Sequence, residues 1–104
     1  MNDGTDAYLR QVREIALRVL APYSVTVYLF GSRAAGGGRR LSDVDIAVES
    51  HGPLPRHLLP ELREALEEST VPYHVDVVDL GAVDPDFRER VRKEAIIWSG
   101  SRIG

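Results

Sequence analysis

Two neighbouring stretches decide the fold: Leu29-Phe30-Gly31-Ser32-Arg33-Ala34-Ala35-Gly36 and Leu41-Ser42-Asp43-Val44-Asp45-Ile46-Ala47-Val48. The first ends a β-branched and aromatic run, Ser24 to Phe30, in a glycine-serine pair, which predicts a buried strand and then a sharp turn. The second predicts a strand over Asp43 to Val48. A glycine-rich, basic segment joins them, so the pattern indicates strand, loop and strand.

The Gly31-Ser32 pair has the chemistry of a phosphate site. The glycine lets the backbone approach a ligand closely, and Ser32 can cap a short helix beginning at Arg33, whose free N–H groups attract anions. The sequence has neither the Gly-Lys-Ser/Thr of a P-loop nor the glycine spacing of a dinucleotide fingerprint. A plain turn between two strands explains the pair equally well.

Asp43 and Asp45 are a stronger signal, because residues two apart in a strand face the same side. Their Cα atoms would lie about 6–7 Å apart, so the two carboxylates could converge on a pair of metal ions. Oxygen ligands of this kind suit Mg²⁺. In the alternative, both acids face solvent while Val44, Ile46 and Val48 form the core face.

A third acid, Asp76, lies within Val75-Asp76-Val77-Val78-Asp79-Leu80. Asp is disfavoured inside strands, so a neighbouring strand that brings Asp76 beside Asp43 and Asp45 is one explanation, and an edge position is the other. His74 is placed to share the face of Asp76. Asp79 is expected in a turn after the strand.

The flanking sequence predicts helices around these strands. Apolar residues recur at helical spacing from about Thr5 to Leu20, and again up to about Glu68 in a helix that starts at Pro60 or bends before it. A third strand is expected within Val71 to Leu80, and a capped helix opens at Asp84-Pro85-Asp86. Its apolar stripe is expected to be core rather than a base-stacking platform, and comprises Phe87, Val91, Ala95 and Trp98. The order α-β-β-α-β-α predicts an α/β (α+β) domain, with the strand order open.

Composition limits the function classes. The 104 residues predict a single domain, 1–104, and the absence of cysteine excludes disulfides, thiol nucleophiles and cysteine-ligated metals. No apolar stretch is long enough to span a membrane, and the polar, acidic N-terminus is unlike a signal peptide, so a cytoplasmic protein is expected. The net charge of −3 argues against direct nucleic-acid binding.

Ten residues separate Ser32 from Asp43, and the resulting pattern Gly-Ser-x10-Asp-x-Asp resembles the signature of the DNA polymerase β-like nucleotidyltransferase superfamily, specifically its minimal nucleotidyltransferases. The resemblance extends over nearly the whole chain, including Val75 to Leu80 and Glu94 to Trp98. It departs at Ala35, where many relatives carry a second arginine. It implies a small mixed sheet of about three strands packed with helices.

The resemblance also implies a reaction. Asp43, Asp45 and Asp76 would hold two Mg²⁺ ions, and Asp76 would help to deprotonate an acceptor hydroxyl that attacks the α-phosphate of ATP. Gly31, Ser32 and Arg33 would bind the nucleotide. A further pair, Arg39 and Arg40, would neutralise triphosphate charge or lie on a solvated loop.

Proteins of this kind act as antitoxins that silence a HEPN-family toxin by adding AMP to a tyrosine. Because the catalytic core accounts for the whole chain, the acceptor is expected to come with its own surface or to be presented by a separate subunit. Two alternatives remain open at this point. The chain is a non-catalytic module that neutralises a toxin by contact, or it transfers a nucleotide to a small molecule.

Overall fold

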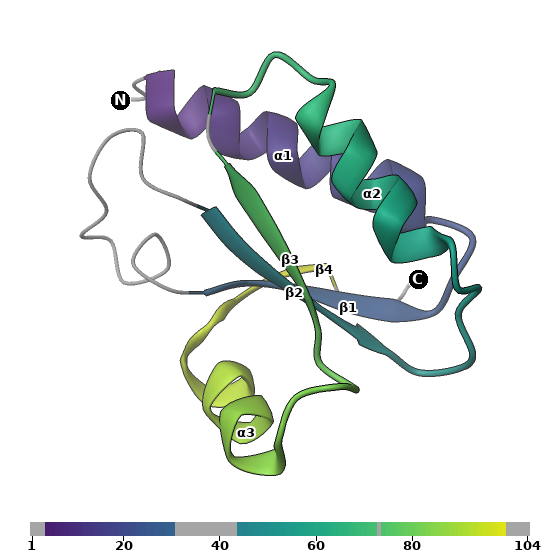
Figure 1. Cartoon of the computed structure of the whole chain (residues 1–104). Helices are drawn as coiled ribbons and strands as arrows, with labels where there is room; N and C mark the ends of the chain where they lie inside the picture. The colour runs from purple at the N-terminus through teal and green to yellow at the C-terminus, as the bar shows by residue number, and fades with distance from the viewer. Residues whose placement is uncertain (1–3, 31–43, 73, 100–104) are drawn as a thin grey trace.

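A four-stranded sheet carries helices on both faces in the computed structural model, which describes residues 4–30, 44–72 and 74–99 (Figure 1). The elements are, in chain order, α1 (Gly4–Leu20), β1 (Val25–Phe30), β2 (Val44–Ser50), α2 (Leu58–Glu67), β3 (Val75–Asp79), α3 (Pro85–Glu94) and β4 (Ile96–Ser99). The expected α/β fold class is therefore confirmed. None of the helices in the described ranges is long and apolar enough to cross a membrane.

The strand order is β3-β2-β1-β4. β1 pairs antiparallel with β2 on one side and with β4 on the other, whereas β2 and β3 are parallel. A parallel pair needs a crossover connection, and α2 supplies it between β2 and β3. The sheet is thus mixed, with β2 in its interior.

The two faces of the sheet are covered by different helices. α1 and α2 lie side by side over one face, and α3 packs on the other (Figure 1). Alternate strand residues separate accordingly: Val27, Leu29 and Ile46 join the larger core under α1 and α2, whereas Tyr28 and Ala47 join the smaller core under α3. This alternation is the period of two that a strand imposes on its side chains.

The helix signals in the sequence give the helix starts closely. α2 begins at Leu58 and not at the expected Pro60. Pro60 lies in its first turn, where a missing N–H breaks no hydrogen bond within the helix. α3 begins at Pro85, and the backbone N–H of Phe87 donates to Oδ1 of the N-cap residue Asp84 at 2.9 Å. The expected capping of this helix is confirmed.

The end of the chain differs from the expectation. The sequence pattern predicts an apolar helical stripe that continues through Ala95 to Trp98, but α3 ends at Glu94, and Ala95 is already extended with φ −81° and ψ 162°. Ile96 to Ser99 form β4, which pairs with β1 and makes a fourth strand. Trp98 consequently packs against the α1–α2 core and not with Phe87 under α3. β-branched residues at 96 and 97 favour an extended backbone, and pairing with β1 satisfies its polar groups.

Candidate active site

Two of the predicted acids lie side by side in the sheet. β2 and β3 run parallel in a register that places Asp45 directly opposite Asp76. Adjacent strands are about 4.8 Å apart, and opposed residues share a face. Two residues further along, Ala47 and Val78 pack in the core under α3, so both carboxylates lie on the α3 side of the sheet. Asp45 is half-buried and Asp76 is exposed.

The other face of β2 explains why these acids are held in place. Val44, Ile46 and Val48 are each 1% exposed or less and form part of the core under α1 and α2. The alternative in which the acids face solvent also predicted that these three residues form the core face of the strand. The face that carries the acids is partly covered by protein, because Ala47, two residues after Asp45 on the same face, is buried under α3. The carboxylates therefore lie at the border of a packed face, where a ligand can be held against protein.

A backbone hydrogen bond joins β2 and β3 where the two strands begin. The N–H of Val44 donates to the carbonyl oxygen of His74 at 2.9 Å. This bond sets the register one residue before Asp45 and Asp76 meet. His74 thus contributes its backbone to the site, and its exposed side chain borders a small cavity of about 150 Å³.

Asp79 is the last residue of β3, two positions beyond the core residue Val77. Its carboxylate accepts a hydrogen bond from the N–H of Gly81 at 2.9 Å. The carboxylate therefore stabilises the turn that follows the strand. The expectation that Asp79 itself lies in that turn is wrong, because its backbone still pairs with Val48 of β2.

The remaining predicted site residues lie outside the described residues: Gly31, Ser32, Arg33 and Asp43, and with them Arg39 and Arg40. Within residues 4–30, 44–72 and 74–99, no group of three His, Cys, Asp or Glu side chains is close enough to hold a metal ion. The described part of the site is thus a pair of carboxylates, Asp45 and Asp76. Such oxygen donors match the ligand preference of Mg²⁺.

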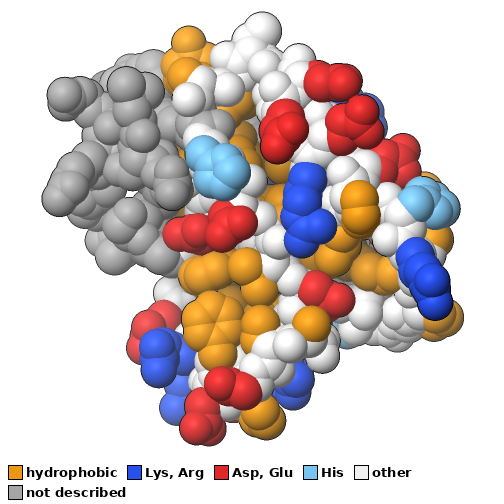
Figure 2. Space-filling view, viewed as in Figure 1, with side chains coloured by type: hydrophobic (Ala, Val, Ile, Leu, Met, Phe, Trp, Pro, Cys, Tyr) orange, Lys and Arg blue, Asp and Glu red, His pale blue; other side chains and the backbone are white. Residues whose placement is uncertain are grey.

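Aromatic side chains border the acids on the same face. Phe30, at the end of β1, lies directly opposite Asp45, so a row Phe30, Asp45, Asp76 runs across three strands. Phe87 of α3 meets Phe30 edge to face, with ring centroids 5.8 Å apart and an interplanar angle of 80°. Figure 2 shows acidic side chains next to a hydrophobic patch above α3. The face therefore combines negative charge with apolar surface.

A polar network that the sequence did not reveal fastens α3 to this face. The hydroxyl of Tyr28 donates to Glu49 Oε1 at 2.6 Å, and the guanidinium of Arg92 donates to Glu49 Oε2 and, at 2.9 Å, to Glu89 Oε2. Burial of the ring and the hydrogen bond to Glu49 raise the pKa of Tyr28 to about 12. The Arg92 hydrogen bond holds the pKa of Glu49 below its usual value.

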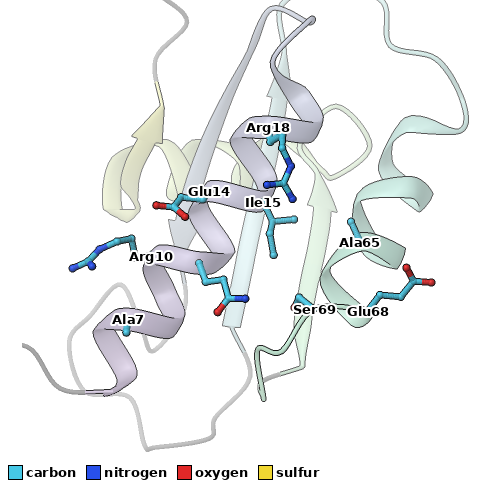
Figure 3. A pocket seen from close by; sticks show the side chains of 9 residues that line it. Ala7, Arg10, Glu14, Ile15, Arg18, Ala65, Glu68 and Ser69 are labelled. Atoms are coloured by element: carbon cyan, nitrogen blue, oxygen red, sulfur yellow. The ribbon is translucent and has the colours of Figure 1, made fainter.

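A broad groove lies elsewhere on the molecule, between α1 and α2 (Figure 3). Its volume is about 700 Å³, and charged side chains line it, among them Arg10, Glu14, Arg18 and Glu68. The helices that form it cover the face of the sheet opposite to Asp45 and Asp76. The groove is therefore separate from the carboxylate pair.

Comparison with known proteins relates this arrangement to a family. The family model described as polymerase beta, nucleotidyltransferase matches residues 19–102. A probable protein adenylyltransferase MntA from Haemophilus influenzae is 37% identical over 86 residues, which cover 83% of this chain and 74% of the relative.

Two solved structures are similar along most of the chain. A candidate minimal nucleotidyltransferase is 35% identical, with a TM-score of 0.69, and the match covers 85% of this chain and 90% of the other. A toxin-antitoxin crystal structure with AMP-PNP contains a chain that is 28% identical, with a TM-score of 0.68, and the match covers 86% and 74% of the two chains.

Proposed function

Because the chain belongs to the polymerase β nucleotidyltransferase family, we propose that it transfers AMP from ATP to a hydroxyl group of a partner protein. The observation that carries this proposal is the register that sets Asp45 opposite Asp76, in a chain that also has the Gly-Ser-x10-Asp-x-Asp pattern. A relative named as a protein adenylyltransferase supports the reaction, and a similar chain solved with AMP-PNP supports ATP as the donor.

Each acid has a role in the proposed reaction. Asp43, Asp45 and Asp76 would hold Mg²⁺, which when bound neutralises triphosphate charge and stabilises the attacking and leaving oxygens. Asp76, exposed at the edge strand β3, accepts the proton of the acceptor hydroxyl. The hydroxyl oxygen then bonds to the α-phosphorus while the bond from that phosphorus to the bridging oxygen breaks, and pyrophosphate leaves. Gly31, Ser32 and Arg33 bind the phosphates of the nucleotide.

The acceptor in this proposal is a tyrosine of a HEPN-family toxin, and the chain is its cytoplasmic antitoxin. Similar chains come from toxin-antitoxin complexes. Asp76 is exposed on the edge strand of the described sheet, where an acceptor carried by another protein could reach it. Modification of a tyrosine would silence the toxin enzymatically, so a small amount of antitoxin would act on many toxin molecules.

Label transfer tests the proposal. The purified protein is incubated with Mg²⁺, α-labelled ATP and lysate of its native host. We expect a labelled protein band that disappears in the Asp43→Asn/Asp45→Asn double variant and in Asp76→Asn. The matched control is Asp79→Asn, on the same strand as Asp76, because an asparagine oxygen can still accept from the N–H of Gly81; it should retain the band.

The alternatives give different results. If the double variant still protects cells fully against the toxin, neutralisation is by contact and the enzymatic account is wrong. If wild-type protein releases pyrophosphate from ATP only when a small hydroxyl compound is added, and labels no protein, the acceptor is a small molecule.

A further inference from the structure

Phe30 and Phe87, which lie on the same face of the sheet as the acids, are more exposed than residues that only fill a core. Phe30 and Phe87 both pack against the smaller core, as expected for Phe87, yet both rings are only half-buried. They meet edge to face, an arrangement in which one ring keeps both of its faces clear of the other. An aromatic face at the border of a polar site can stack on another flat ring.

The order of strands determines on which side of the acids these rings lie. Along the row from β1 through β2 to β3, the residues are Phe30, Asp45 and Asp76. Asp45 therefore separates the rings from Asp76. Since the proposed function assigns Asp76 to the acceptor hydroxyl, the phenylalanines lie on the opposite side of Asp45, which is the side left for the donor nucleotide.

Phe87 is held firmly in this position. The Asp84 carboxylate caps the first turn of α3 by accepting from the N–H of Phe87 itself. The neighbouring Arg88 donates to the carbonyl oxygens of Leu80 at 2.9 Å and of Val83 at 3.3 Å. These bonds tie the start of the helix to the loop that follows β3. A ring fixed before a ligand arrives loses little conformational freedom on binding.

From these observations we propose that Phe30 and Phe87 form the base-binding wall of the site, and that the adenine of the donor nucleotide stacks on this pair. The surroundings fit a neutral, flat ring, since Val78 and Val83 pack against the same core. The inference rests on the proposed function, because it assumes that a nucleoside triphosphate binds at Asp45.

The test compares two ligands that share phosphates and differ in the base. Dissociation constants for ATP and for inorganic tripolyphosphate are measured by calorimetry with Mg²⁺, for wild-type protein and Phe87→Leu. Base stacking on one aromatic side chain contributes about 1–3 kcal/mol, so we expect ATP to bind at least about fivefold more weakly to Phe87→Leu. Tripolyphosphate has no base to stack, so its affinity should be nearly the same for the two proteins. Trp98→Leu, a similar loss of a half-buried aromatic on the other face, is the matched control and should leave both affinities unchanged.

Every other result overturns the inference. Unchanged ATP affinity in Phe87→Leu would show that the base lies elsewhere, and equal weakening of both ligands would show that the ring only supports the fold. If wild-type protein binds ATP while Phe87→Leu is unaffected, the proposed function survives and the base wall does not. If wild-type protein binds neither ligand, both fail.

Discussion

The hydrogen bond between Tyr28 and Glu49 gives a stability prediction with a definite sign at each pH. Tyr28 is 6% exposed, and its hydroxyl lies 2.6 Å from Glu49 Oε1. Hydrogen bonds to charged groups contribute about 1.5–3 kcal/mol. Tyr28→Phe leaves Glu49 paired with Arg92, so the loss should be at the lower end, about 1.5 kcal/mol at pH 7, or about 6–12 °C in Tm for a domain of this size.

The pH dependence follows from the raised pKa of Tyr28, which is about 12 in the folded protein against about 10 in an unfolded chain. A raised folded pKa means that the stabilisation is complete below pH 10 and is lost as the pH rises towards 12, because the unfolded chain releases the proton first. At pH 11 this linkage removes on the order of 1 kcal/mol from the wild type. The Tyr28→Phe variant has no hydroxyl proton to lose at this position, so the difference in stability between the two proteins should be clearly smaller at pH 11 than at pH 7.

Urea denaturation at pH 7, 9, 10 and 11, followed by circular dichroism, measures this difference. Tyr23→Phe is the control, because Tyr23 packs against the opposite core and the substitution leaves the hydrogen bond between Tyr28 and Glu49 in place. A Tyr28→Phe difference that is the same at pH 7 and pH 11 would refute the linkage. Equal stability at pH 7 would refute the contribution of the hydrogen bond itself.

Two further predictions concern the site and the helix beside it. Millimolar Mg²⁺ with ATP should raise the Tm of the wild type, by an amount equivalent to about 2.7 kcal/mol when ATP is at about 100 times its Kd. The same ligands should not raise the Tm of Asp45→Asn. Differential scanning fluorimetry measures both, with EDTA-treated protein as the reference. Asp84→Ala removes the cap of α3 and should lower the free energy of unfolding by about 1 kcal/mol, whereas Asp84→Asn, which can still accept the bond, should lower it by much less in the same urea titration.

Local signals in the sequence predicted most of the elements correctly. The cap at Asp84 and the apolar period of the first helix identify helices because the interactions involved span only a few residues. β4 was missed for a related reason. Ala95 and Trp98 continue the spacing of Phe87 and Val91, and over so short a segment helical spacing and strand alternation cannot be told apart. The deciding interaction, pairing with β1, comes from a segment far earlier in the chain.

In the candidate site, too, local signals identify some residues and miss others. Asp43 and Asp45 are candidates because they are two residues apart and would share one strand face, and Asp76 is a candidate because an acid is unexpected between two valines in a strand. Their roles remain predictions. The network of Tyr28, Glu49 and Arg92 had no local signal, because its members come from β1, β2 and α3 and each is an ordinary residue in its own segment.

The sequence by itself determined the identity and spacing of the chemical groups: the glycine-serine pair, the acids two apart, and the alternation that puts Val44 and Ile46 on one face and Asp45 on the other. Only the tertiary structure decided that β3 lies parallel to β2 in the register that sets Asp76 opposite Asp45, and that α3 packs on the acid face with Phe87 against Phe30. The physical reason is that side-chain alternation is a property of each strand alone. Strand register depends on which faces can be buried together, and that requires the whole chain.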